Sequence, residues 1–436
     1  MRRFVIAGCV VGALSVATLV AVVWATREPM CNGTPVREFV QLAAIANNYE
    51  ARALAIEQLQ TVAPVAVTYI VNSLNGHTNS LRDRINLQWA KLYRKLPASI
   101  QKIMPKPRGR FLVDARMWLG ALAEIGPKDE RVIPALTKEL KHSDSEMRFF
   151  ATHSLALIAT NWLEHPIIGP QIIETLTGRL SDRAGNVRGA AAVGLGYCGA
   201  VAKAQMPQLV DRLSDTDGNT RMHALRALVN IGAETNLILP YIQKLIADTD
   251  PEVRAYAAYT HWKLTGERGT NLLVLREVLH GQAEERKRGL AAGYLGLLGP
   301  KALEAVPDLT RALADPEFQI SGPAAKALWR ITGETERPVR FFKRMLAEGQ
   351  WHERAYSAEA LTLIAAPAEA ALPEIIDALT AREYYVRKAA TRAAGAMGPN
   401  ARAALPELKN LLNDRFPSIR AEARTAIKAI ESDGAR

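Results

Sequence analysis

The segment GNTRMHALRALVNIG at residues 218–232 recurs in variants along this chain of 436 residues. The other copies are SEMRFFATHSLALIA (145–159), GNVRGAAAVGLGYCG (185–199), PEVRAYAAYTHWKLT (251–265), ERKRGLAAGYLGLLG (285–299), YYVRKAATRAAGAMG (384–398) and PSIRAEARTAIKAIE (417–431). Each copy contains one aligned arginine, which we call its anchor; the anchors are Arg148, Arg188, Arg221, Arg254, Arg288, Arg387 and Arg420. Arg354 is a further anchor, and Ser321 stands where another anchor is skipped. Successive anchor positions lie mostly 33 or 34 residues apart. The step from 148 to 188 is longer, at 40 residues, and contains the insertion NWLEHPII. A period of this size indicates a solenoid of stacked repeats.

Each repeat is predicted to hold two helices. In the quoted segments, apolar or small residues occur one residue before the anchor and three, six, seven and ten residues after it, which is helical spacing. The third position is a small residue that lets a neighbouring helix approach closely. It is Ala151, Ala191, Ala224, Ala257, Ala291, Ala324, Ala390 and Ala423.

Another helix precedes each anchor, and a proline stands near its start. These prolines are Pro207, Pro240, Pro307, Pro373 and Pro406. Gly-Pro or Ala-Pro pairs at 299–300, 366–367 and 398–399 are expected to end the second helices. Asp-Pro-Glu at 250–252 and at 315–317 predicts an N-cap followed by a proline at the first helical position.

The composite pattern G-P-x-A-x-x-A-x-P-x-L…D-x-x-V-R-x-x-A-A-x-A-L-x-x-I-G resembles the HEAT repeat, in the short form of bacterial HEAT-like and phycobilisome-lyase-type proteins. The resemblance covers residues 111–432, with weaker copies back to about 36. Ankyrin and tetratricopeptide repeats are excluded because their T-P-L-H and Trp-Leu-Gly-Tyr patterns are absent from the sequence. The resemblance implies an all-α, right-handed solenoid of about ten helix pairs, whose second helices line a concave groove.

The N-terminus predicts a membrane or export segment. After Arg2 and Arg3, residues 4–24 carry no charge, and as a helix they would span about 30 Å, the thickness of a bilayer core. We expect a transmembrane signal anchor at 4–25, with residues 1–3 cytoplasmic and the solenoid exported to a periplasmic or extracytoplasmic side. The alternative is a signal peptide cleaved near Ala25, which would release a secreted protein.

The net charge of +11 is concentrated in one place, because residues 82–110 hold nine basic residues and one acid. Residues 111–436 hold 41 basic and 39 acidic residues, so they are nearly neutral. A nucleic-acid-binding surface would spread its charge along the repeats, so this distribution makes nucleic acid an unlikely partner.

The basic segment 81–110 belongs to a region, 26–110, that we expect to form divergent N-terminal helices. Its apolar residues follow helical spacing and are surrounded by cations, which is typical of helices that lie on an anionic membrane. The candidate membrane-surface residues are Arg84, Trp89, Lys91, Arg94 and Lys95. The alternative is an irregular helix pair that caps the next repeat with its apolar stripe.

No catalytic motif is present in the sequence. It lacks G-x-S-x-G, the P-loop and H-E-x-x-H. Among HEAT-like proteins, deoxyhypusine hydroxylase needs several His-Glu pairs to hold iron, and this chain has one, His352-Glu353. Cys198 takes the place of an apolar core residue, so we expect a buried thiol. We therefore predict no enzyme, no cofactor and no metal site.

The anchor arginines have two interpretations, a polyanion site or a structural ladder between repeats. The resemblance implies the ladder. An acidic residue also stands four positions before five of them, which predicts an ion pair within the helix. These acids are Asp144, Asp217, Asp250, Glu284 and Glu383.

A better candidate binding surface consists of the second, fifth and ninth positions after the anchor, which should face the groove. These positions are rich in aromatic and basic residues in the middle repeats, as in binding hot spots. They include Phe150, His153, His223, Arg226, Asn230, Tyr256, Tyr259, Lys263, Lys326, Arg330 and Tyr356, with Glu359 beside them. The alternative is a solvated face with incidental aromatic residues.

The sequence thus predicts a scaffold that binds another protein or peptide in its groove. Two alternatives remain: a lyase-like accessory subunit that acts on a bound prosthetic group, and a nucleic-acid-binding HEAT protein with a cytoplasmic body. Neither the partner's identity nor the oligomeric state follows from the sequence.

Overall fold

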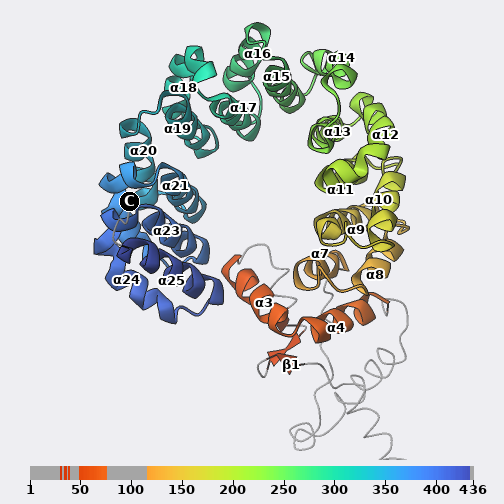
Figure 1. Ribbon diagram of the computed structural model, residues 1–436, viewed down its shortest axis with the longest axis horizontal. Coiled ribbons are helices and arrows are strands. Elements are labelled where there is room, and N and C mark those ends of the chain that lie inside the picture. Colours follow the sequence, from red (N-terminus) through yellow and green to blue (C-terminus); the bar gives the residue numbers. More distant parts are fainter. Residues whose placement is uncertain (1–29, 32–33, 37, 40–48, 76–114, 433–436) are drawn as a thin grey trace, which may run out of the picture. The chain divides into compact units, whose positions relative to one another are not determined.

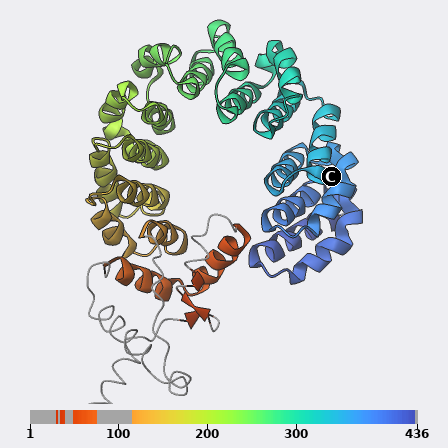
Figure 2. The same ribbon diagram turned by 180° about the vertical axis from the view of Figure 1, so that it is seen from behind.

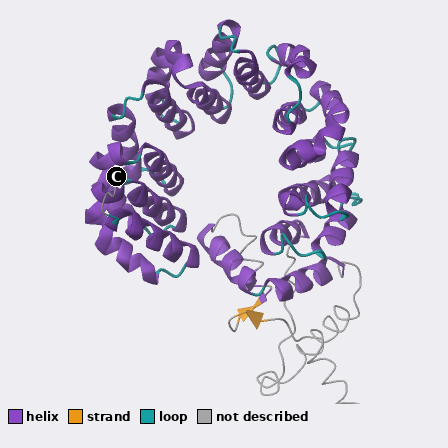
Figure 3. Ribbon diagram, viewed as in Figure 1, coloured by secondary structure: helices purple, strands orange, loops and turns teal. Residues whose placement is uncertain are grey.

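A computed structural model describes residues 30–31, 34–36, 38–39, 49–75 and 115–432. In this part of the chain the structure is helical, except for a short antiparallel pair of strands, β1 (Met30–Cys31) and β2 (Thr34–Pro35) (Figure 3). The all-α class is therefore confirmed. The predicted membrane segment 4–25 and the basic segment 81–110 lie outside the described residues.

No single described helix combines the length and apolar composition of a membrane span. A pair of consecutive helices, α3 (Tyr49–Thr61) and α4 (Ala63–Asn75), meets these criteria only jointly, and the pair is bent by 105° between Ala53–Thr61 and Ala63–Asn72.

The chain divides into two compact units, residues 1–161 and 162–436. In the first unit, α4 packs against α7 (Ala115–Ile125) and α8 (Val132–Glu139), and both α7 and α8 pack against α9 (Ser145–Ile158). A 3-10 turn, η1 (Ala159–Asn161), ends this unit. The Oγ atom of Ser154 on α9 donates a hydrogen bond of 3.0 Å to the carbonyl oxygen of Leu119 on α7.

The second unit is a stack of helix pairs in two rows, seen from both sides in Figures 1 and 2. The inner row consists of α11 (Gly185–Cys198), α13 (Gly218–Ile231), α15 (Pro251–Thr265), α17 (Glu285–Leu298), α19 (Phe318–Thr332), α21 (Trp351–Ile364), α23 (Tyr384–Ala396) and α25 (Pro417–Glu431). The outer row consists of α10 (Ile168–Arg179), α12 (Met206–Asp211), α14 (Thr235–Leu245), α16 (Gly269–His280), α18 (Val306–Leu313), α20 (Glu336–Glu348), α22 (Leu372–Leu379) and α24 (Leu405–Asn410). Short 3-10 segments join or extend these helices: η2 (Gly199–Gln205), η3 (Arg212–Ser214), η4 (Gly299–Ala305), η5 (Ala366–Ala371), η6 (Gly398–Ala404) and η7 (Leu411–Asn413).

The predicted alanine column forms the seam between helices. All eight alanines at the third position after the anchor are 0% exposed. Each inner helix packs against its own outer helix and against the inner helices of the adjacent repeats, as α17 does with α16, α15 and α19. The small side chain therefore sits where a helix has neighbours on several sides.

One of the two Asp-Pro-Glu segments begins a helix as predicted, with the aspartate as N-cap and the proline as the first helical residue. Asp250 caps α15 by accepting a hydrogen bond from the Glu252 N–H, and Pro251 is the first helical residue. The second segment was wrongly predicted, because α19 begins at Phe318 and Asp315 lies before it. The carboxylate of Asp315 instead accepts from the Glu317 N–H and pairs with Arg288 on α17.

Candidate functional site

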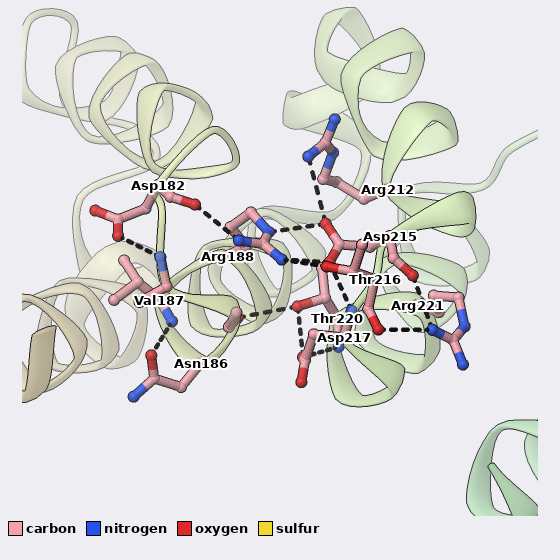
Figure 4. Close-up of polar contacts among 12 residues, drawn as sticks. Asp182, Asn186, Val187, Arg188, Arg212, Asp215, Thr216, Asp217, Thr220 and Arg221 are labelled. Atoms are coloured by element: carbon pink, nitrogen blue, oxygen red, sulfur yellow. Dashed lines mark hydrogen bonds and ion pairs between the residues drawn. The ribbon is translucent and has the colours of Figure 1, made fainter.

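Anchor arginines form a ladder along the second unit, and Figure 4 shows the junction between Arg188 on α11 and Asp215. The guanidinium of Arg188 on α11 donates from Nε to Oδ2 of Asp215 at 2.8 Å and from Nη1 to the carbonyl of Asp182 at 2.9 Å. Arg221 on α13 repeats this arrangement, with its Nε 2.7 Å from Oδ2 of Asp248. Each arginine thus joins its own repeat to the next one. Burial opposes ionisation of Asp215, but the hydrogen bonds from Arg188 and from the backbone outweigh burial and hold its pKa below the usual value.

For Arg221, the structure records other partners than the ion pair predicted within its helix. The carboxylate of Asp217, four residues before Arg221, accepts instead from the backbone N–H of Thr220 at 2.8 Å. This acid lies at the N-cap, where unpaired N–H groups compete for it, while the arginine reaches a carboxylate 27 residues further along the chain. The interpretation of the column as a structural ladder is confirmed.

The ladder has a gap at Arg254 on α15. Its Nη1 atom donates to the carbonyls of Asp248 at 2.8 Å and Thr249 at 3.2 Å, as its counterparts do. The other ladder arginines pair with an aspartate 27 residues later in the chain, as Arg221 does with Asp248. The residue at this distance from Arg254 is Gly281. Within the described residues, Arg254 accordingly has no carboxylate partner.

The open side of the inner row carries the fifth and ninth positions. Outer helices cover α15 from behind, and α13 and α17 lie on its flanks. Asn230 and Lys263 at the ninth position are exposed, and Arg226, Tyr259 and Lys326 at the fifth are half-buried. These side chains therefore reach solvent on the side away from the outer helices.

The second position is more buried than predicted. Tyr256 is only 7% exposed, and the His223 ring lies 3.4 Å from where a side chain on Gly189 of the preceding inner helix would begin. This column packs between adjacent inner helices. Phe150 and His153, on α9, belong to the first unit, where both are half-buried and His153 stacks on Phe149 with ring centroids 5.8 Å apart.

Three tyrosines form a cluster on α15 and α17. The rings of Tyr259 and Tyr294 stack with centroids 5.1 Å apart and an interplanar angle of 17°. Tyr256 lies behind them, 5.7 Å from Tyr294, and burial raises its pKa to about 12. Tyr294 was missed as a site residue because it stands at the sixth position after its anchor, which the sequence pattern assigns to the core. The signal that could have identified it is its size, since the smaller residues Thr260 and Ala327 occupy this position in the repeats on either side.

Arg226 on α13 contributes a positive charge to this cluster. Burial raises the pKa values of Tyr256 and Tyr294, and the charge of Arg226 partly opposes this shift. Burial first, and then Arg226, lowers the pKa of His223 to about 4, so this imidazole is neutral at pH 7. Its Nδ1 atom is buried and has no hydrogen-bond partner among the residues that the structure describes.

A second group of rings and cations lies on α19 and α21. The Nζ atom of Lys326 is 5.7 Å from the ring centroid of Tyr356, and Phe318 meets the same ring edge-on at 5.4 Å. Burial, and then the neighbouring charge of Arg330, lowers the pKa of Lys326. Glu359 on α21 is the acid whose charge opposes this shift.

The described residues hold no group of three or more potential metal ligands. Cys198 is 3% exposed, as predicted, and burial raises the pKa of its thiol to about 11. It is therefore a protonated core residue at neutral pH rather than a nucleophile.

Comparison with known proteins gives a family model and several similar folds. Residues 173–262 and 339–428 match the family model for HEAT repeats. No curated protein matches the chain.

Similar solved structures include the CpcE–CpcF complex of phycocyanin lyase from Nostoc sp. PCC7120, with 17% identity, 68% of this chain and 94% of that chain covered, and a TM-score of 0.36. Human deoxyhypusine hydroxylase has 21% identity, with 72% and 100% covered and a TM-score of 0.27. Kap121p has 14% identity, with 91% and 48% covered and a TM-score of 0.36. Scores of this size establish no residue correspondence and no shared activity.

Proposed function

The chain carries HEAT repeats in a helical solenoid, and we propose that it is a non-enzymatic scaffold that binds another protein through the inner helices of its second unit. The observation that carries this proposal is the row of rings and cations on the open side of α13–α21. Tyr259 and Tyr294 present a stacked pair there, and Arg226, Lys326 and Arg330 lie on the helices around it.

The residue types of this row are those that dominate protein interfaces. Tyrosine and arginine are enriched at hot spots because they combine a large contact area with a polar tip. The buried alanine and leucine columns form the core of each repeat, whereas Tyr259 and Tyr294 are only partly buried beside it. Half-buried rings also lose little conformational entropy on binding, since their neighbours already hold them in place.

We expect the double substitution Arg226→Gln plus Tyr259→Ala to reduce recovery of a bound protein at least tenfold. The measurement is a crosslinking pull-down from membranes with the full chain, quantified by mass spectrometry. Tyr241→Ala plus Lys244→Gln, on the outer helix α14, is the matched control and should leave recovery unchanged. Equal recovery with both variants, each shown to be folded by circular dichroism, would remove this surface as the binding site.

We propose further that residues 4–25 anchor the protein in a membrane and that the solenoid is exported. The support is the uncharged run after Arg2 and Arg3 and the orientation that these cations favour. The basic segment 81–110 stays a prediction as a membrane-surface element.

Fractionation tests the anchor. The full chain is expected to stay in the membrane pellet after an alkaline carbonate wash, and its solenoid should be digested by protease added from the extracytoplasmic side. Deletion of residues 4–25 should release the chain from the membrane pellet and should leave its solenoid protected from the added protease. A mature protein that begins near Ala25 and is found in the soluble fraction would favour the cleaved signal peptide, and a protease-resistant body in intact cells would contradict export.

A further inference from the structure

The open side of five consecutive inner helices has an unbalanced charge. In α11, α13, α15, α17 and α19, the second, fifth, sixth and ninth positions after the anchor contain no carboxylate. They contain four cations: Arg226, Lys263, Lys326 and Arg330. The first acid at these positions is Glu359, on α21.

The fold does not neutralise these four cations. Within the part of the chain that the structure describes, none of them forms an ion pair or a hydrogen bond with a carboxylate, and the one recorded partner is the ring of Tyr356, which faces Lys326. The ladder arginines differ, since Arg188, Arg221, Arg288 and Arg387 each bind an aspartate of the next repeat. Arg226 and Lys326 are moreover half-buried, so they have lost part of their hydration without forming an ion pair within the described residues, although the charge of Glu359 on α21 acts on Lys326.

The centre of this surface is apolar. On α17, between the cation-bearing helices α15 and α19, the corresponding positions are Leu290, Gly293, Tyr294 and Leu297. Leu297 is 53% exposed, and the stacked pair of Tyr259 and Tyr294 lies beside it. Cations thus occur on both sides of an apolar and aromatic strip.

The dimensions suit an extended peptide. Packed helices lie about 8–10 Å apart, so the three steps from α13 to α19 cover roughly 25–30 Å. An extended chain rises about 3.3 Å per residue, which makes this distance about eight or nine residues. Nucleic acid is a poorer match, because its affinity depends on neutralising many phosphates, and residues 111–436 hold 41 basic against 39 acidic residues.

We infer that the inner face of α13–α19 binds an extended peptide segment of about eight or nine residues in which acidic residues flank an apolar centre. This inference rests on the proposed function and specifies the chemistry of the partner. Carboxylates of the peptide form ion pairs with Arg226, Lys326 and Arg330, and its apolar centre covers Leu297 and the tyrosine pair. Electrostatic attraction of this kind also accelerates association, which makes binding sensitive to salt.

The test is a fluorescence anisotropy titration of the detergent-solubilised full chain with a labelled peptide, Asp-Glu-Asp-Gly-Leu-Phe-Leu-Gly-Asp-Glu-Asp. We expect binding that weakens at least tenfold when every Asp and Glu is replaced by Asn and Gln. It should weaken equally in the variant Arg226→Gln plus Lys326→Gln. The control, Lys244→Gln plus Lys301→Gln, removes the same charge from exposed outer positions and should change binding less than twofold.

Three results would overturn the inference: no binding of the acidic peptide, equal binding of the amide peptide, or equal loss in the outer control. Tighter binding of a labelled oligouridylate of eleven nucleotides, lost in the inner variant, would assign the surface to nucleic acid instead. The proposed function is judged separately by the pull-down. If the pull-down variant Arg226→Gln plus Tyr259→Ala loses a captured protein but the acidic peptide does not bind, the scaffold proposal stands and the acidic specificity fails. If neither experiment gives binding, both proposals fail.

Discussion

Gly289→Ala is expected to lower the free energy of unfolding of the second unit by about 3 kcal/mol, because the added methyl group would overlap a backbone atom of the next repeat. A Cβ atom on Gly289 of α17 would overlap the carbonyl oxygen of Gln319 on α19 and would lie 3.0 Å from its carbonyl carbon. Backbone atoms within a helix cannot rotate away as a side chain can. The two inner helices must therefore separate, and the contacts of their whole interface weaken.

Gly293→Ala, in the same helix, is the matched control. A Cβ atom there meets nothing within 4 Å. Alanine is a better helix former than glycine by about 0.5–1 kcal/mol, so this variant should be slightly more stable than the wild type. Urea unfolding followed by circular dichroism measures both. Shifts of the same sign and size in the two variants would contradict the close approach of α17 and α19.

The second large effect is expected for Arg221→Ala, which removes one bond of the ladder. Only 14% of the Arg221 side chain and 7% of the Asp248 side chain are exposed. Removing the guanidinium leaves a buried carboxylate without its counter-charge, a change that costs about 3–5 kcal/mol. Stability in a solenoid depends on contacts between adjacent repeats, so the loss should appear locally in α13 and α15.

Arg254→Ala is the comparison that distinguishes the energy of the ion pair from that of the arginine's backbone hydrogen bonds and packing. Like Arg221, Arg254 donates to the carbonyl six residues before it, at 2.8 Å, but it has no carboxylate partner in the structure's described ranges. We expect this variant to cost about 1–2 kcal/mol, the value of hydrogen bonds and packing without the buried pair. Native-state hydrogen exchange of α13 and α15 gives the local opening free energies. Equal losses for the two arginines would show that the pair with Asp248 does not stabilise the junction.

Sequence reasoning was most successful for features that depend on neighbours along the chain. The period of 33 residues, the two helices per repeat and the buried alanines such as Ala224 and Ala257 all follow from spacing within one short segment. It was least successful where a side chain interacts with another repeat. Tyr256 was expected to be exposed and is buried, whereas Tyr294 was assigned to the core and stacks on Tyr259.

Helical periodicity, the stacked-repeat class and the N-cap at Asp250 are local properties, so the order of residues is enough to specify them. Other features depend on how adjacent helices are aligned. They are the partner of each ladder arginine, the start of α19 at Phe318 rather than Pro316, and the grouping of Arg226 with three tyrosines. That alignment results from the packing of whole faces and from close approaches such as the one at Gly289. A small shift between two helices exchanges one set of neighbours for another without changing the periodicity of either helix, and for this reason the tertiary structure was needed to identify them.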